Sequence, residues 1–479
     1  MRAALLVALV LAGVWAQGLQ ITLPKTLYEA KESYFFRPAV ANEKYVVFGY
    51  LGKVKPTHRE VQEQRKRLQQ IIKGTIEREY GSWENYTKVA EQQGEEIAKQ
   101  YGKETPAWTQ AILPPSVVQK AVPLLLQGAL AFAMYSGTSS EPIGNVGKTG
   151  IVTIDRDGHV RHMQLAINEP VEYIELHPSK PWALVLCDAS YEDQNRFHTV
   201  GHIILVNLER GKIEREWIFA NATDQAGFTP DGKIAFVVQN PKDWSDRALR
   251  FIDIETGKLL PKSLYPMSRG SYIGKKGVLH IPKRFGFWRD LLIVAAPKGW
   301  DIYRYPALQR IGHIFSGRQF LALAKRHPWL YNDLGCIWDI QKVQKLVCLE
   351  PKEREFIGGM FVEEDRKVVA ANMFSFVGLY DARSGRRIAH DTHPYHRGNV
   401  FATDSEGRYI FAGKSGSGRK LIRVMGLRRN LVGVNIFTNS LDFLAHVEPE
   451  GGDTTISYAV RGDTLYLGGV KAIYSYTIP

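Results

Sequence analysis

The chain has 479 residues, of which 44% are hydrophobic and 23% are charged. This balance excludes a chain that is disordered throughout, because enough apolar side chains are present to bury a large core. The formal net charge of +13 predicts attraction to anionic polymers or surfaces, without identifying one.

The first sixteen residues have the features of a signal peptide. Arg2 supplies a positive charge, residues 3–14 form an apolar run, and residues 14–16 fit the small-residue cleavage pattern. The run is too short to span a bilayer, so no transmembrane span is expected, and no cysteine follows the cleavage point to accept a lipid. We expect residues 1–16 to be removed near Gln17 and the protein to be secreted, periplasmic or at the cell surface. An uncleaved N-terminal anchor is the alternative.

A long segment of different character separates two predicted pairs of strands. The strand pairs are expected at residues 34–40 with 45–50, and at 150–155 with 159–165. Between them, amphipathic helices are predicted at 59–80 and at 82–101, with Ser82 as the cap, and an apolar helix at 116–135. We therefore expect residues 52–148 to be an α-helical insertion in the first structural repeat. Trp83 and Tyr86 are its candidate partner-binding residues.

The clearest repeat runs from residue 226 to residue 260. Its turns, residues 230–232 (Pro-Asp-Gly) and 255–258 (Glu-Thr-Gly-Lys), each join two short β-rich runs. Proline presets φ and glycine supplies the positive φ that tight connections between antiparallel strands require. This four-strand pattern resembles the repeat of the WD40 and YVTN-type β-propeller superfamily. The resemblance covers most of the chain outside residues 52–148; it implies an architecture and no particular activity.

Counting the weaker copies of this repeat gives eight, with seven as the alternative. The expected fold class is therefore all-β: one closed β-propeller domain over residues 17–479, with the helical insertion in blade one. The last copy lacks a fourth strand. The alternating run at residues 19–24 is expected to supply it, which would remove an exposed sheet edge.

In the superfamily that the repeat resembles, connections between the second and third strands emerge on the face where ligands usually bind. The insertion lies at such a connection, and long loops are expected at others, over residues 188–199, 240–246 and 413–418. This face is the predicted binding site.

A basic stretch runs from Arg383 to Arg429, with eleven Lys or Arg residues against three acids, an excess of 11 − 3 = 8 positive charges. Its candidate anion-binding residues are Lys414, Arg419, Lys420 and Arg423. Other members of the stretch, among them Arg383, Arg386 and Arg387, are expected in turns on the opposite face. The alternative is a solvated basic surface with no ligand.

The three cysteines are too few for a disulfide scaffold. Cys336 and Cys348 flank a predicted hairpin with its turn at residues 341–344, so they are a candidate disulfide; two separate buried thiols are the alternative. Cys187 is expected to be an unpaired core residue.

Histidines with ligand-like spacing occur at 159 and 162, at 198 and 202, and at 390, 393 and 396. No cysteine accompanies any group, so neither a metal site nor a cofactor is predicted.

The leading functional hypothesis is a non-catalytic binding scaffold that recognises an envelope or extracellular protein or an anionic polymer. A subunit of a larger surface assembly is a related possibility. The rival hypothesis is a propeller enzyme, hydrolytic or redox, with its site at the mouth of the central channel. Sequence-specific binding to nucleic acid is not predicted. The architecture hosts binding modules and enzymes alike, so the repeats cannot decide between these readings.

Overall fold

The structure of the chain is a computed structural model. It describes residues 25–29, 34–52, 147–167, 169–193, 196–219, 223–240, 243–267, 272–273, 279–280, 285–296, 299–315, 320–350, 356–372, 377–393, 400–413, 433–449, 453 and 457–478, and isolated positions between 57 and 88. The described chain divides into two compact units.

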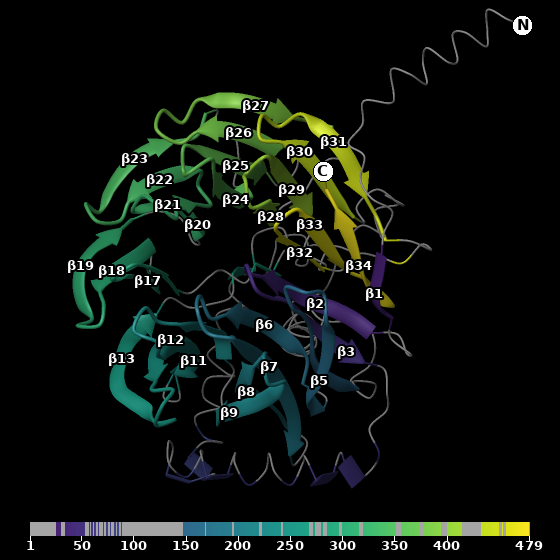
Figure 1. The fold of residues 1–479 in the computed structure, drawn as a ribbon. Coiled ribbons are helices and arrows are strands. Elements are labelled where there is room, and N and C mark those ends of the chain that lie inside the picture. Colours follow the sequence, from purple (N-terminus) through teal and green to yellow (C-terminus); the bar gives the residue numbers. More distant parts are fainter. Residues whose placement is uncertain are drawn as a thin grey trace, which may run out of the picture. The chain divides into compact units, whose positions relative to one another are not determined.

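Eight four-stranded sheets follow one another along the described chain (Figure 1), which is the strand pattern of β-propeller blades. In seven of the sheets the strands are hydrogen-bonded in the order in which they occur in the sequence, and the eighth is completed by the N-terminal strand β1. The expectation of eight blades is confirmed over the alternative of seven.

The first unit spans residues 1–50, 151–162 and 316–479 and holds five sheets, the first of which extends into the sequence range of the second unit. Their strands are β2 (Tyr34–Ala41), β3 (Val46–Gly52), β4 (Lys148–Ile154) and β5 (Val160–Ile167); β20 (Phe320–Leu323), β21 (Trp329–Asn332), β22 (Cys336–Asp339) and β23 (Gln344–Cys348); β24 (Phe356–Val362), β25 (Lys367–Asn372), β26 (Val377–Asp381) and β27 (Arg387–Asp391); β28 (Val400–Thr403), β29 (Tyr409–Gly413), β30 (Val434–Thr438) and β31 (Phe443–Val447); and β32 (Ser457–Arg461), β33 (Thr464–Gly468) and β34 (Ala472–Thr477) with β1 (Lys25–Glu29).

The second unit spans residues 51–150 and 163–315 and holds three sheets. Their strands are β6 (Val171–Leu176), β7 (Trp182–Asp193), β8 (Arg196–Asn207) and β9 (Lys212–Phe219); β10 (Thr223–Phe228), β11 (Ile234–Asn240), β12 (Asp243–Ile252) and β13 (Leu259–Met267); and β16 (Phe285–Trp288), β17 (Leu291–Ala296), β18 (Gly299–Arg304) and β19 (Gln309–Ile314). A two-stranded sheet, β14 (Tyr272–Ile273) with β15 (Leu279–His280), precedes β16.

The inner strands are buried on both faces, so they appear in the sequence as continuous apolar runs. Every residue of β17 is buried, whereas the fourth strand β23 is exposed or half-buried along its length. In the second unit, Leu184 and Ile203 of one sheet join a single buried cluster with Phe236 of the next. Each sheet therefore uses its neighbour to cover a face that it cannot bury alone.

The fourth strand of the last sheet lies a few residues later in the sequence than expected. Strand β1 pairs antiparallel with β34, Lys25 opposite Ser475 and Glu29 opposite Ala472. An N-terminal strand does complete the last sheet, but residues 25–29 do so, and residues 19–24 lie outside the described residues. Leu27 and Tyr28 pack against a buried cluster that includes Phe36, which explains why this segment is the one that pairs.

Two predicted long loops are largely strand. Strands β7 and β8 continue pairing to Asp193 and Arg196, well beyond the last pairing of β6, at Val171 with Cys187. Strands β11 and β12 likewise extend to Asn240 and Asp243. The expected loops at 188–199 and 240–246 were therefore wrong.

Residues 53–147 connect β3 to β4, the second and third strands of their sheet. No bounded helix occurs among the described residues of this segment; helical backbone is found only at isolated positions between Arg59 and Lys88. The helical character of residues 52–148 stays a prediction, and the segment 116–135 lies outside the described residues.

Candidate functional site

The long connections of the chain leave the sheets at one end of each sheet. The turns between first and second strands are short, as at residues 42–45 and 404–408, and so are those between third and fourth strands, as at 340–343. The segments 53–147 and 414–433 instead join second to third strands. Because short turns hold the other end, this is the end at which variable loops can carry a binding surface.

The predicted binding residues belong to these connections. Lys414, Arg419, Lys420, Arg423, Trp83 and Tyr86 all lie outside the described residues, so each stays a prediction. Arg383, Arg386 and Arg387 are described, and they lie at the other end of their sheet, in and beside the turn between β26 and β27. The basic stretch is therefore divided between the two ends.

The root of the insertion is fixed by a group of polar contacts. The Glu60 carboxylate accepts hydrogen bonds from the Thr57 backbone N–H at 2.8 Å, the Thr57 hydroxyl at 2.9 Å and the Lys148 Nζ at 3.1 Å. The Glu60 backbone N–H donates to Thr57 Oγ1 at 3.2 Å, which completes the reciprocal pair of a capping box. The hydrogen bond from the Thr57 backbone N–H, together with the hydrogen bond from the Lys148 side chain, lowers the pKa of Glu60 to about 2. The insertion is thus tied to the first residue of β4.

A second capping contact lies further along the insertion. The Asn85 backbone N–H donates to Ser82 Oγ at 3.1 Å, the contact that an N-cap serine makes. Ser82 therefore has the local geometry predicted for it, next to the candidate residue Trp83.

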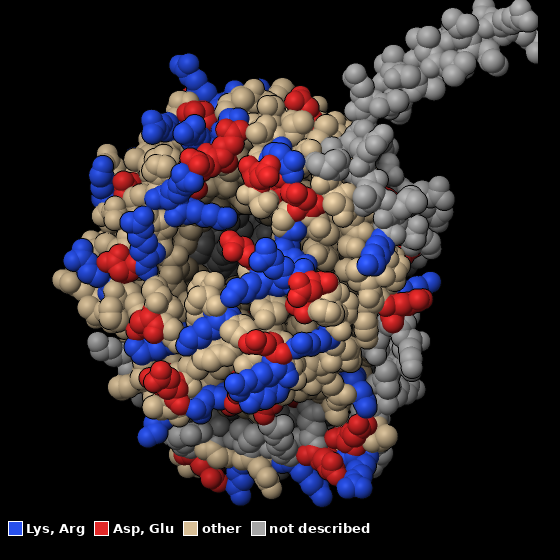
Figure 2. All heavy atoms as spheres, viewed as in Figure 1, with Lys and Arg blue, Asp and Glu red and all other residues tan. Residues whose placement is uncertain are grey.

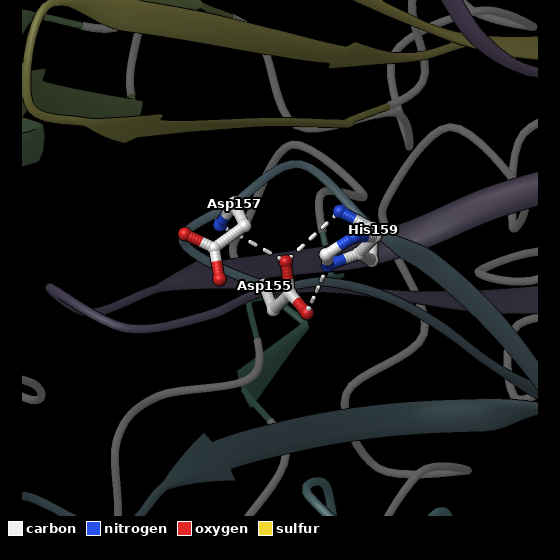
Figure 3. A group of neighbouring side chains, drawn as sticks. All are labelled: Asp155, Asp157 and His159. Atoms are coloured by element: carbon white, nitrogen blue, oxygen red, sulfur yellow. Dashed lines mark hydrogen bonds and ion pairs between the residues drawn. The ribbon is translucent and has the colours of Figure 1, made fainter.

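Asp155, Asp157 and His159 are the group of three potential metal ligands found in the described part of the chain, with ligand atoms within 4.8 Å of one another (Figure 3). Sequence reasoning missed this group because it weighed His159 only with His162. Asp155 Oδ1 accepts the backbone N–H groups of Asp157 at 3.0 Å and His159 at 2.9 Å, and Oδ2 lies 3.1 Å from His159 Nδ1. Burial raises the pKa of Asp155, but these hydrogen bonds lower it by more, so it lies below its usual value.

The same turn chemistry recurs in other sheets. The side chains of Asn207, Asp253, Asp339 and Asp381, each at or next to the end of a third strand, accept a backbone N–H three residues later. A short polar side chain that bonds the backbone ahead of it stabilises a tight turn. The Asp155 carboxylate is thus engaged in capping its turn, and we assign the group a structural role.

A buried acid–imidazole pair lies at the start of the sheet β6–β9. Glu169 Oε2 lies 2.6 Å from His202 Nδ1, and the two side chains are 2% and 4% exposed. Glu216 approaches the other ring nitrogen at 3.8 Å. Cys187, which is buried and in no disulfide, lies opposite His202 in the register of β7 and β8. A thiol, an imidazole and a carboxylate are thus neighbours, but their burial keeps a substrate from reaching them in this conformation.

Cys336 and Cys348 face each other in the register of β22 and β23 and are joined by a disulfide. The bond ties the third strand of this sheet to its outer strand. No helix in the described part of the chain has the length and apolar character needed to cross a bilayer.

Comparisons with known proteins add a fold likeness and nothing on activity. No protein-family model matches the chain, and no curated protein matches it. Among solved structures, the chain is similar to the C-terminal WD40 domain of Sif2, with 10% identity, a TM-score of 0.48, and coverage of 70% of this chain and 92% of that one. It is also similar to the computationally designed Ika8 protein, with 12% identity, a TM-score of 0.42, and coverage of 64% and 95%. A chain of the mitotic checkpoint complex matches with 11% identity, a TM-score of 0.43, and coverage of 62% and 86%.

Proposed function

We propose that the chain is an exported, non-catalytic binding scaffold whose long second-to-third-strand connections recognise another envelope or extracellular protein. The observation that supports this proposal is the contrast between the two ends of the sheets. Short capped turns hold one end, while residues 53–147 and 414–433 are connections at the other. A rigid scaffold with variable loops at one end is a common arrangement for recognition.

The disulfide supports the proposed location outside the cytosol. Cys336–Cys348 bonds persist in oxidising compartments, whereas cytosolic thiols are kept reduced. The signal-like residues 1–16 point the same way. Intact mass measurement of the native protein under non-reducing conditions tests both features, since the bond and the removal of the leader each change the mass.

The experiment that tests the binding function is affinity purification of the native protein at low and at moderate salt, followed by mass spectrometry. We expect a protein partner at a stoichiometric level, retained at moderate salt. W83A/Y86A should lose this partner. The matched control is F443A, which removes an exposed aromatic side chain beside a short turn at the other sheet end.

Other outcomes would select the alternatives. Recovery of an anionic polymer that is lost at moderate salt, and in a K414Q/R419Q/K420Q/R423Q variant, would replace the protein partner with a polyanion. Co-purification of several proteins in a fixed ratio would make the chain a subunit of a larger assembly. A monomer that carries a metal or a quinone would contradict the scaffold and favour the propeller enzyme.

A further inference from the structure

The outer corner of two neighbouring sheets in the first unit forms one continuous surface. The turn at residues 382–386, between β26 and β27, lies directly on strand β23: the Glu350 backbone N–H donates to Gly385 O at 2.9 Å. A Cβ added at Gly385 would lie 2.7 Å from Val347 Cγ2. The side chains of this turn and of β23 therefore belong to the same patch, which we call the β23–β27 corner.

Five exposed cations lie at this corner. None of them lies within ion-pair distance of a carboxylate among the described residues; they are Lys342, Lys345, Arg383, Arg386 and Arg387. Some cations in other turns are paired, such as Arg326 with Glu364 at 2.7 Å and Arg408 with Asp463 at 2.9 Å. Figure 2 shows Lys and Arg side chains spread over this part of the molecule.

The acids of the corner are largely engaged. Asp339 accepts the backbone N–H groups of Gln341 and Lys342, and Asp381 accepts the backbone and hydroxyl of Ser384. Glu350 is the exposed acid next to the turn. Among the described residues, the corner holds five cations without an ion pair and one carboxylate without one, Glu350, so this part of it is complementary to an anionic surface.

Two aliphatic side chains project between these cations. Leu346 in β23 is 41% exposed and Ile388 in β27 is 49% exposed. Each lies at a break in the pairing register with the third strand, between Ile337 and Trp338 in one sheet and between Leu379 and Tyr380 in the next. A bulge re-aims the side chain of the extra residue, and no fifth strand covers either outer strand in the described sheets.

We propose that the β23–β27 corner binds the surface of an anionic phospholipid bilayer. Lys and Arg attract the lipid phosphates, and guanidinium groups bind phosphate oxygens with two parallel hydrogen bonds. Leu346 and Ile388 then enter the boundary between headgroups and acyl chains, where burying apolar area is favourable. A soluble polyanion has no apolar region in which these two side chains can be buried. An anionic bilayer therefore fits both the charged and the apolar side chains of the corner, whereas a soluble polyanion fits only the charged ones. This surface is separate from the sheet end that the scaffold proposal concerns.

The test is co-sedimentation of the full-length mature protein with vesicles of phosphatidylcholine, with and without phosphatidylglycerol, at low and at high salt. Wild type should bind only the anionic vesicles, and less at high salt. R383Q/R386Q/R387Q should lower the partition constant by about 100-fold, because each cation near an anionic membrane contributes about a fivefold increase. L346S/I388S, which leaves the charge unchanged, should lower it by about tenfold.

The matched control is K44Q/R156Q/K258Q, which removes the same charge from exposed turn positions elsewhere. It should lower binding by less than about tenfold, because these charges are not part of the corner and salt screens their attraction to the bilayer. Thermal unfolding of every variant establishes that it is folded.

Three results would overturn the proposal. The first is no binding of wild type to anionic vesicles at low salt, and the second is equal loss in the control and in R383Q/R386Q/R387Q. The third is full competition by soluble polyglutamate together with unchanged binding of L346S/I388S, which would make the corner a site for soluble polyanions.

Discussion

The Asp365 carboxylate joins two neighbouring sheets, and its replacement tests how the blades are held together. The side chain is 4% exposed and belongs to the turn between β24 and β25. It accepts three backbone N–H groups from the turn between β20 and β21: Lys325 at 3.1 Å, Arg326 at 2.6 Å and His327 at 3.0 Å. One acid thus satisfies three donors of the preceding sheet.

Asp365→Asn keeps the volume of the side chain and tolerates the positive φ of 71° at this position, so it isolates the loss of charge from backbone strain. The amide retains one oxygen and puts an NH₂ group against at least one of the three donors. Because hydrogen bonds to a charged group contribute about 1.5–3 kcal/mol each, we expect the free energy of unfolding to fall by about 2–4 kcal/mol. The assay is urea unfolding, with hydrogen exchange of amides 325–327 as the local readout.

Glu364→Gln is the matched control in the same turn. Its partner Arg326 lies 2.7 Å away, but both side chains are more than half exposed, so its removal should cost about 0–1 kcal/mol. The reasoning would be refuted by an effect of Asp365→Asn below about 1 kcal/mol, or by an equal effect of the control.

Three further predictions concern other parts of the chain. Gly385→Ala should lower the free energy of unfolding in urea by about 2 kcal/mol more than Gly158→Ala does. The two glycines have similar φ values of 71° and 85°, but only the Cβ added at Gly385 meets neighbouring atoms. Equal effects of the two substitutions would contradict this prediction. The free energy of unfolding of the C336S/C348S variant should be about 3 kcal/mol lower, because the unfolded chain is no longer cross-linked between two residues 12 positions apart. A stability equal to that of wild type would show that the bond does not constrain the unfolded chain. The Glu60 pKa of about 2 lies below its ordinary value of 4.5, so the contact with Lys148 stabilises the fold fully above about pH 4.5 and is lost as the pH falls toward 2. Pepsin should therefore cleave residues 53–147 faster in Glu60→Gln than in wild type near pH 4. Equal cleavage rates would argue against this anchor.

The blade series was predictable because its turns are local in sequence. The turn at residues 229–233 contains a Pro-Asp-Gly run: Gly232 has a φ of 79°, and the Lys233 backbone N–H donates to Thr229 Oγ1 at 2.8 Å. Such contacts span only a few residues, so the residue types in that short stretch predict the turn.

The position of β1 was harder to predict, because pairing across the whole length of the chain selects between two neighbouring segments. Residues 19–24 alternate apolar and polar side chains, whereas residues 25–29 do not. The packing of Leu27 and Tyr28 against the cluster around Phe36 favours the second segment, and sequence periodicity does not contain that contact.

The β23–β27 corner could not be recognised as a site from the sequence for a related reason. Lys345 and Arg386 are separated by about forty positions and meet only because one sheet packs on the next. Arg386 was expected in a turn on the face opposite to Lys414, but nothing along the chain indicated that this turn would lie against the strand that carries Lys345.

Because β1 pairs with β34, the last sheet is complete only when residues 25–29 and residues 472–477 are both present. A ribosome makes residues 25–29 long before residues 472–477, so β1 has no partner during most of synthesis. Its hydrogen-bonding groups and the apolar side chains of Leu27 and Tyr28 stay uncovered until the far end of the polypeptide arrives. A product that lacks β1 leaves β34 as the sheet edge, whereas a product that lacks β34 leaves β33 as the edge and β1 without its partner, so quality-control proteases would meet an uncovered edge in both cases.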